Sequence, residues 1–409
     1  MLVAGGGSAG LAAAVAAARL GARTVLVERH GVLGGMASAA LVHSICGLYL
    51  LPAKGEPPVL ANEGFATEFA QRLQAAGGAS GPVRMGRVDV LLQRPAAFAL
   101  LADEIVRETK GLTVCLHSEI VSAGQTVTLS CRGRTETLRP RVQIDTTGDA
   151  VLASFRGVAC EMESSQHLQR PAFIFALGGV EPGHLSDDNR LRLALRIAGA
   201  VRAGTLPEGA LGAHLRESSQ EGEVFVTIDL TGGVDFDPLD PACLTRLEME
   251  GRTLATKLTE FLRREVEGFA CSYIAAWPSR VGVRESRRII GRYRLEADDL
   301  LACTVFPDAV AFATWPMELR ETATGPRLRY PTGNQPCGIP LRSLRARDVD
   351  DLWMAGRCIS CSHEAQASIR VIGTCLATGE AAGLASALQA LGKSAEALDV
   401  IAARHQISR

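Results

Sequence analysis

Short apolar runs and an alanine-rich segment alternate at the start of the chain. Residues 2–4 and 24–27 are apolar, and the second run carries the β-branched side chains that favour buried strands. Between them, residues 9–20 are rich in alanine and end at Gly21, where glycine commonly terminates a helix. The pattern predicts a strand, a glycine-rich turn, a helix and a second strand, which form a β-α-β unit of an α/β fold.

The rest of the chain has a less regular pattern. We expect further helices at residues 62–75, 94–110, 188–203, 242–267 and 371–390. We expect further strands at residues 112–122, 125–138, 141–144, 172–177, 223–230, 309–315 and 351–355. Strands and helices mix irregularly in the middle, whereas a strand followed by a helix returns near the C-terminus.

These elements predict two domains. The first is an α/β domain built from both ends of the chain, residues 1–155 and 346–409. A mixed α+β substrate domain, residues 156–345, is inserted between them. Residues 50–90 are expected to contribute to the cleft between the two.

Composition and charge exclude several classes of protein. Hydrophobic residues make up 47% of the 409 residues and charged residues 21%, which excludes a largely disordered chain. The net charge of −1 gives no overall basic field, so we expect neither nucleic acid nor an anionic membrane as a partner. The eleven cysteines are scattered and odd in number, which indicates reduced thiols in a cytoplasmic protein.

The apolar N-terminal segment is not expected to be a targeting sequence. Residues 1–20 lack a basic beginning and contain three consecutive glycines, unlike a signal peptide. The sequence also lacks the uninterrupted run of roughly 18 apolar residues that a transmembrane helix needs. We therefore expect a soluble protein, and its oligomeric state is left open.

The turn after the first strand has the spacing Gly5-x-Gly7-x-x-Gly10. Gly5 permits a tight turn, Gly7 lets a pyrophosphate approach the backbone, and Gly10 lets the helix pack against the strand. The helix N-terminus adds amide donors and a partial positive charge. Glu28 ends the second strand, where a carboxylate accepts hydrogen bonds from ribose hydroxyls. We interpret the combination as a dinucleotide site, and the alternative is a turn that serves packing alone.

Four later segments decide which dinucleotide is expected: residues 34–38, 144–149, 351–358 and 374–383. With the glycine-rich turn, they resemble the two-dinucleotide-binding-domain flavoproteins of the glutathione-reductase fold, and most closely the FAD-dependent oxidoreductases. The resemblance implies an α/β, Rossmann-like FAD-binding domain of glutathione-reductase type with an inserted mixed α+β substrate domain. It also implies noncovalently bound FAD. Thr146 departs from the family pattern, which usually has alanine there.

The same resemblance implies contacts along the whole cofactor. The Gly34-Gly35 pair and Ser38 lie along the ribose and pyrophosphate, and Ile120 offers backbone groups to the adenine. The helix N-terminus at Gly373 and Thr374 approaches the flavin N1–C2=O, where it stabilises the negative charge of a reduced flavin. The residues expected to contact FAD are Gly5, Gly7, Ser8, Ala9, Gly10, Glu28, Arg29, Gly34, Gly35, Met36, Ser38, Ile120, Thr147, Gly148, Gly356, Arg357, Ile372, Gly373 and Thr374.

Motifs of several other mechanisms are absent from the sequence. A second Gly-x-Gly-x-x-Gly on a strand, turn and helix is missing, so no pyridine-nucleotide domain is expected. Cys358-x-x-Cys361 lacks the second ligand pair of a zinc site, and we expect no metal. His43 and Cys46 are candidates for covalent flavin attachment, but neither lies in an attachment motif, so we expect noncovalent FAD.

Arg284 is the first candidate for substrate chemistry. Arginines crowd residues 280–292, and Glu285 is the only carboxylate nearby in the sequence. We therefore expect the unpaired guanidinium of Arg284, or that of Arg287, to hold a carboxylate or another anion. The alternative is a structural role in which Glu285 pairs with Arg288.

His363 and Arg370 are the other candidate catalytic residues. His363 follows a loop that passes beside the flavin in this fold, and a histidine is suited to proton transfer at neutral pH. The alternative is a histidine that only hydrogen-bonds the loop. Arg370 precedes the last long helix and is expected over the flavin or in the substrate pocket, unless it pairs with Glu364.

The sequence as a whole predicts an oxidoreductase that transfers a hydride between a small organic substrate, anionic if Arg284 binds it, and flavin N5. Electrons then pass to dioxygen, a quinone or another protein. The alternatives are an RNA-modifying flavoprotein and a non-enzymatic FAD redox sensor that uses Cys358 and Cys361. Tyr330, Asn334 and Gln335 lie in a Pro/Gly loop that is a candidate cover of the site.

Overall fold

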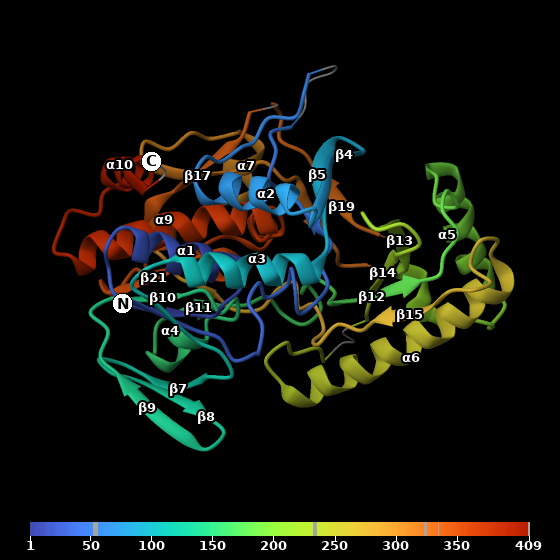
Figure 1. The fold of residues 1–409 in the computed structure, drawn as a ribbon, viewed down its shortest axis with the longest axis horizontal. Coiled ribbons are helices and arrows are strands. Elements are labelled where there is room, and N and C mark those ends of the chain that lie inside the picture. The colour runs from blue at the N-terminus through green and yellow to red at the C-terminus, as the bar shows by residue number, and fades with distance from the viewer. Residues whose placement is uncertain (52–55, 232–234, 323–324, 334, 408–409) are drawn as a thin grey trace.

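A computed structural model describes residues 1–51, 56–231, 235–322, 325–333 and 335–407 (Figure 1). Its centre is a five-stranded sheet with the order β21-β10-β1-β2-β6, in which all neighbouring strands are parallel. The strands are β1 (Leu2–Ala4), β2 (Thr24–Val27), β6 (Leu112–Cys115), β10 (Gln143–Asp145) and β21 (Leu352–Met354). Both ends of the chain therefore build one sheet, as the sequence predicts.

Two buried helices that start at the same side of this sheet lie together: α1 (Ser8–Arg19) and α9 (Ile372–Ala390) (Figure 1). Their backbones approach so closely that a β-carbon at Gly379 or Gly383 of α9 would clash with the carbonyl oxygens of Ala9 and Ala13. Small residues on both helices permit this approach. The contact joins the N-terminal and C-terminal parts of the domain.

Smaller elements surround this core. The helices are α2 (Phe65–Ala75), α3 (Pro95–Glu108), α4 (Val151–Phe155), α7 (Ala297–Leu301), α8 (His363–Ile369) and α10 (Ala397–Ile407). The sheet β3-β5-β4 contains β3 (Ser44–Ile45), β4 (Ala79–Met85) and β5 (Val88–Gln93). The two-stranded pairs are β11 (Cys160–Glu161) with β16 (Arg288–Ile289), β17 (Ala309–Ala313) with β20 (Cys337–Pro340), and β18 (Met317–Leu319) with β19 (Arg327–Arg329).

The strand expected at residues 112–122 is two strands. β6 ends at Cys115, and β7 (Glu119–Ala123) instead joins β8 (Val127–Cys131) and β9 (Arg134–Leu138) in an antiparallel sheet. His117 lies between them with φ 53°, a left-handed conformation that breaks an extended strand. The apolar pattern did not reveal this break, because it runs through both strands.

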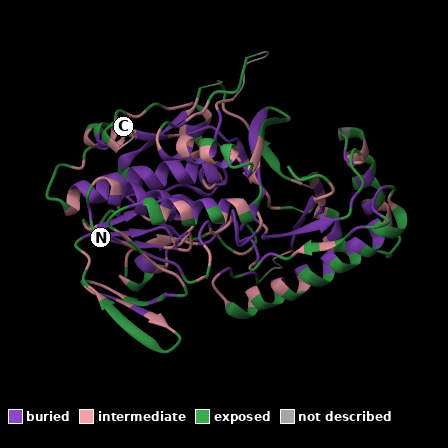
Figure 2. Ribbon diagram, viewed as in Figure 1, coloured by how far each residue is buried: buried purple, intermediate pink, exposed green. Residues whose placement is uncertain are grey.

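The inserted part of the chain contains an antiparallel sheet with the order β13-β14-β12-β15. Its strands are β12 (Ala172–Gly178), β13 (His214–Glu217), β14 (Val224–Asp229) and β15 (Tyr273–Ala276), and the long helices α5 (Asp187–Arg202) and α6 (Pro241–Glu265) lie beside it (Figure 1). One sheet face, with Phe173, Phe175 and Val226, belongs to a hydrophobic core that includes residues of both helices (Figure 2). The opposite face is directed towards the α/β domain.

The hydrophobic cores divide the chain differently from the predicted domains. The second core contains residues from Leu168 to Val283, whereas Ile289, Met317 and Leu344 belong to the core of the α/β domain. The last part of the expected insertion, residues 156–345, therefore packs with the first domain. Its short strands and turns have no apolar periodicity that indicates which core they join.

Among the described residues, no single helix is long and apolar enough to cross a membrane. Helices α8 and α9 together meet the length and composition of a span, but they are bent by 95° at the break between them.

Gly379→Val should destabilise the protein by roughly 1–3 kcal/mol, because the added side chain forces α9 away from α1. Ala390→Val, at the partly buried end of the same helix, is the matched control for the lower helix propensity of valine. Thermal unfolding of the two variants and the parent measures the difference. Equal stability of both variants would show that the helices do not depend on this contact.

Candidate functional site

The turn between β1 and α1 has the conformation that its glycines predict. Gly5 has φ +97°, and a β-carbon at Gly10 would clash with the carbonyl oxygen of Gly5. The Thr146 hydroxyl donates to the carbonyl oxygens of Ala4 at 2.7 Å and Gly5 at 2.8 Å. Thr146, which departs from the family pattern, therefore holds the turn in place.

The Gly34-Gly35 pair lies against this turn. The Gly34 amide donates to the Gly6 carbonyl oxygen at 2.8 Å, and a β-carbon at Gly35 would lie 2.9 Å from the Gly7 Cα. The Ser8 hydroxyl also reaches the Gly34 carbonyl oxygen, at 3.5 Å. The two glycine segments predicted for the cofactor are thus brought together.

Two predicted residues beside these segments have their own protein contacts. The Ser38 hydroxyl donates to the Leu33 carbonyl oxygen at 2.6 Å and so holds its own loop. Gly356 packs against the start of α1, where its added β-carbon would lie 2.9 Å from that of Ala9. Ser38 thus lies beside Gly34 and Gly356 beside the start of α1, and their contacts with a cofactor stay predictions.

Glu28 and Ile120 line one small cavity although they come from different strands. Its lining residues are Gly5, Val27, Glu28, Arg29, Ser118, Glu119, Ile120, Thr147, Asp149, Val151 and Arg280. The buried Glu28 carboxylate accepts hydrogen bonds from the amides of Gly6 at 2.7 Å and His30 at 2.8 Å. These contacts direct the carboxylate to the glycine-rich turn, where the sequence predicts the ribose.

Three guanidinium groups gather near Asp149 beside this cavity. Arg357 donates to its Oδ1 at 2.6 Å, Arg29 lies 4.0 Å from its Oδ2, and Arg280 lines the same cavity. A β-carbon at Gly148 would lie 2.9 Å from the Arg357 guanidinium, which explains why the residue before Asp149 is glycine. Arg357 Nη1 is buried without a hydrogen-bond partner, so the cluster is suited to a further anion. Arg280 is a candidate cofactor residue that the sequence analysis missed.

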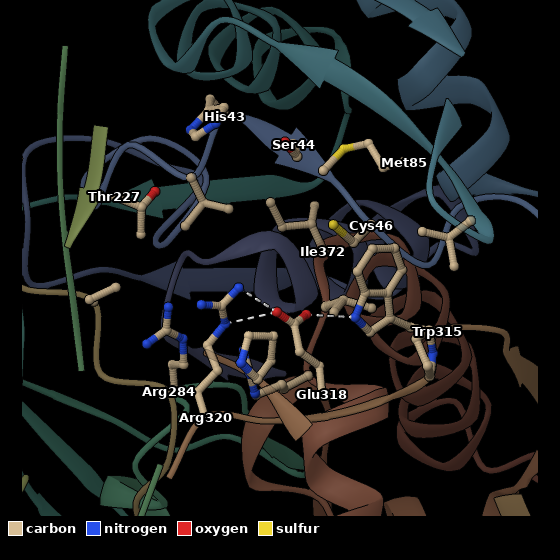
Figure 3. A pocket seen from close by; sticks show the side chains of 18 of the residues that line it. His43, Ser44, Cys46, Met85, Thr227, Arg284, Trp315, Glu318, Arg320 and Ile372 are labelled. Carbon is tan, nitrogen blue, oxygen red and sulfur yellow. Dashed lines mark hydrogen bonds and ion pairs between the residues drawn. The ribbon is translucent and has the colours of Figure 1, made fainter. Parts of the chain in front are cut away.

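A second, larger cavity of about 540 Å³ lies between the inserted sheet and the α/β domain (Figure 3). Met36, Arg357 and Ile372, all predicted to contact FAD, are among its lining residues. Its other walls come from the inserted sheet, from β3 to β5, and from residues 315–330. Tyr330 also lines it, Gln335 does not, and Asn334 lies outside the described residues.

Arg284 lines this cavity, but the expectation that its guanidinium is unpaired is wrong. It donates to Asp229 Oδ1 at 2.7 Å and to the Arg170 carbonyl oxygen at 2.5 Å. Asp229 also accepts from Arg320 at 2.6 Å. Burial alone would raise the pKa of Asp229, but the two guanidinium groups outweigh it and hold the pKa far below its usual range. The charge of Arg284 is therefore neutralised within the protein.

Arg287, the alternative to Arg284, does not line the cavity. Its guanidinium donates to the Asp149 carbonyl oxygen at 3.0 Å and to the Ser154 hydroxyl at 2.7 Å. The structural pair of Glu285 and Arg288, which the sequence left open, is present at 2.6 Å.

His363 lies in a buried ionic cluster rather than on the cavity wall. Its Nδ1 is 2.8 Å from Glu285 Oε1, and its Nε2 is 3.1 Å from Glu321 Oε1. Burial disfavours the charged imidazole, but the hydrogen bonds to the two carboxylates outweigh it and raise the pKa of His363. These contacts favour a positioning role for His363 over proton transfer to a substrate.

Arg370 lines the cavity and forms no ion pair with Glu364 among the described residues. Its guanidinium donates to Gln169 Oε1 at 3.1 Å, while its buried Nε has no hydrogen-bond partner. Burial, together with the positive charge of Arg284, lowers the pKa of Arg370 to about 10. The placement agrees with the substrate-pocket interpretation of this residue.

The start of α9 differs from expectation at Gly373. Its amide donates to the Cys46 carbonyl oxygen at 2.9 Å, so that donor is already used within the protein. Ile372 reaches the cavity wall, and the buried Thr374 hydroxyl oxygen has no hydrogen-bond partner. The sequence could not predict this, because the loop that covers Gly373 comes from the distant residues 46–48.

A family model described as FAD dependent oxidoreductase matches residues 1–407. The chain belongs to the FAD-dependent oxidoreductase family. FAD is therefore the cofactor of this flavoenzyme. A search of curated proteins found no match.

Solved flavoprotein structures align with this FAD-dependent oxidoreductase at low identity. A geranylgeranyl bacteriochlorophyll reductase-like protein from Thermoplasma acidophilum is 12% identical with a TM-score of 0.45, covering 100% of this chain and 82% of that one. A flavin-dependent brominase is 11% identical with a TM-score of 0.47, covering 100% and 83%. The p-nitrophenol 4-monooxygenase of Pseudomonas putida is 12% identical with a TM-score of 0.39, covering 72% and 69%.

Unsatisfied polar atoms along the groove of this oxidoreductase fit FAD. One terminal nitrogen of Arg357, Nη1, is buried without a hydrogen-bond partner beside the glycine-rich turn. The Thr374 hydroxyl is buried and unpartnered at the start of α9. A pyrophosphate near Arg357 and Arg280 and a flavin carbonyl near Thr374 supply the acceptors that these donors lack.

Arg280→Gln should weaken FAD binding by roughly 1.5–3 kcal/mol, because a charged hydrogen-bond donor to the pyrophosphate is lost. It should also reduce the dependence of FAD affinity on salt concentration. Arg264→Gln, at an exposed position of α6, is the control. Titration of the apoprotein with FAD measures both effects, and an unchanged dissociation constant for Arg280→Gln would exclude this role.

Proposed function

We propose that this FAD-dependent oxidoreductase removes a hydride from a small organic substrate bound in the 540 Å³ cavity and transfers it to flavin N5. The observation that carries the proposal is the shared wall of Met36, Arg357 and Ile372, which joins the predicted cofactor groove to this cavity. FAD, when bound, supplies the hydride acceptor. The protein supplies the position of the substrate and the electrostatic environment.

His43 is the proposed hydrogen-bond acceptor that orients the substrate. It lines the cavity, stacks on Phe225 with a ring-centroid distance of 4.5 Å, and has no hydrogen-bond partner for either ring nitrogen. Burial and the nearby His214 lower the pKa of His43 to about 3. The neutral ring can therefore accept a hydrogen bond from a substrate hydroxyl or amine throughout the physiological pH range.

Arg370 and the start of α9 are proposed to face the flavin. Both the guanidinium of Arg370 and the helix N-terminus carry positive charge, which favours the negative charge that a reduced flavin acquires. The glutathione-reductase-type arrangement of FAD stays part of this proposal. Its support is the glycine-rich turn packed against Gly34 and Gly35.

The proposed electron acceptor is dioxygen, a quinone or a protein rather than a pyridine nucleotide. The inserted sheet β13-β14-β12-β15 is antiparallel throughout, unlike the parallel β-α-β arrangement that binds a second dinucleotide. The sensor alternative has less support, because Cys358 and Cys361 are buried. Burial raises the pKa of Cys361 to about 12, which suppresses the reactive thiolate. The absence of a nucleic-acid or membrane partner and the cytoplasmic location stay predictions.

NADH and NADPH should fail to bleach the flavin of the anaerobic holoenzyme, whereas photoreduction should bleach it completely. Stopped-flow absorbance measures both reactions. Small alcohols and amines that carry a carboxylate form the substrate panel, and we expect at least one to reduce the flavin. Rapid reduction by either nucleotide would contradict the proposed acceptor class.

His43→Ala should slow that substrate-dependent reduction while leaving the FAD content of the protein unchanged. A matched change at another cavity wall, Val42→Ala, controls for the loss of packing. Equal rates for His43→Ala and the parent would exclude this orienting role of His43.

A further inference from the structure

The inserted sheet presents one polar face to the cavity. His214 and Arg216 alternate with the core residue Leu215 along β13, so both project to the cavity side. In the register of the sheet, His214 lies opposite Thr227, and Arg216 lies opposite Phe225. Thr227 also lines the cavity (Figure 3). The fold thus places a guanidinium on a strand whose paired residues, Thr227 and Phe225, carry no charge.

Most arginines that line the cavity have a carboxylate partner. Arg84 pairs with Asp89 at 2.6 Å, and Arg357 pairs with Asp149 at 2.6 Å. Arg284 and Arg320 both pair with Asp229, which offsets part of their positive charge. Carboxylates therefore hold these guanidinium groups within the protein, and among them Arg357 keeps a free Nη1 at the proposed cofactor site.

Arg320 has a second partner in Glu318, whose Oε1 accepts at 2.8 Å, and Trp315 Nε1 donates to the other carboxylate oxygen at 3.0 Å (Figure 3). Burial alone would raise the pKa of Glu318, but the charges of Arg320 and Arg370 outweigh it and lower the pKa. Glu318 is thus ionised, and its charge is used within this network. It leaves no free carboxylate to balance a further cation on the cavity wall.

Arg216 differs from these residues. In the part of the chain that the structure describes, its side chain forms no hydrogen bond and no ion pair, although it is half-buried. Withdrawing a charged group from water without a partner costs free energy. Burial, together with the nearby Arg190, accordingly lowers the pKa of Arg216. An anion that enters the cavity removes this cost.

The second guanidinium without a carboxylate partner, Arg370, lies directly before the N-cap of α9. It is therefore at the proposed flavin end of the cavity, while Arg216 is on the inserted sheet. The cavity wall also carries apolar side chains, among them Val42, Met85 and Ile174. Its volume of about 540 Å³ is typical of sites for small organic molecules.

We propose that Arg216 binds the carboxylate of a monocarboxylic acid whose apolar body lies along this wall and directs its reacting carbon towards the flavin. A guanidinium holds a carboxylate with two parallel hydrogen bonds, which fixes its orientation as well as its position. This inference rests on the proposed function, because it assigns the substrate class of the same cavity. It moves the anion receptor from Arg284, whose charge Asp229 neutralises, to Arg216.

Benzoate, phenylacetate and hexanoate, each titrated into the oxidised holoenzyme, test the proposal. At least one should perturb the flavin absorption spectrum with saturation, whereas its neutral amide should not. Arg216→Gln should weaken the binding by roughly tenfold or more, as expected for the loss of a charged hydrogen bond. Arg216→Lys keeps the charge but loses the planar fork, so its affinity for the acid should lie between those of the parent and Arg216→Gln.

Arg192→Gln is the matched control, because Arg192 is an exposed arginine on α5 that does not line the cavity. The FAD content of every variant is measured first, so a folding defect in Arg216→Gln is seen before any titration. If that variant loses FAD, Arg216→Lys carries the test.

Three results would overturn the inference: no acid binds, an amide binds as well as its acid, or the Arg216 variants bind the acid as tightly as the parent. In each case a holoenzyme that oxidises neutral substrates would leave the proposed function intact. A purified chain that takes up no FAD would instead end the proposed function itself.

Discussion

The close contact between α1 and α9 is the constraint on which the functional site depends. α1 begins at the glycine-rich turn, and α9 begins at the wall of the large cavity. Because Gly379 and Gly383 bring the two backbones together, the turn and the cavity are held at a fixed separation. A cofactor that spans both places therefore meets a preorganised groove rather than two independent sites.

Charge is the second feature that organises the site. Carboxylates neutralise several of the arginines that line the cavity, and these pairs connect the inserted sheet to residues 315–320. The single carboxylate of Asp229 accepts hydrogen bonds from both Arg284 and Arg320, which come from different segments. Such pairs fix the walls, and the guanidinium groups that lack carboxylates, Arg216 and Arg370, remain for ligands.

Local patterns in the sequence predicted the parallel sheet, the glycine-rich turn and the helix after residue 371, because each depends on neighbouring residues. Partners distant in the sequence were not predictable in this way. Asp229 lies 55 residues from Arg284, so counting carboxylates near residue 284 led to the wrong conclusion that Arg284 is unpaired. The many arginines of this segment did indicate a site for an anion, but the local pattern favoured Arg284. Arg280 instead lines the small cavity with Glu28 and Ile120.

The placement of His363 shows a similar limit. Its position after the predicted flavin loop suggested proton transfer, whereas Glu285 and Glu321, both remote in sequence, enclose it. His43 illustrates the opposite case, because nothing in the sequence indicates that both its ring nitrogens are buried without partners.

We propose that FAD extends from Ile120 past the glycine-rich turn to Arg370. Acid denaturation of the purified chain, followed by chromatography of the released flavin, tests this placement. We expect FAD, released without a covalent remnant, because both the adenosine end and the flavin end of the cofactor are proposed to lie within this chain. Release of FMN, or a colourless protein that takes up no added FAD, would contradict it.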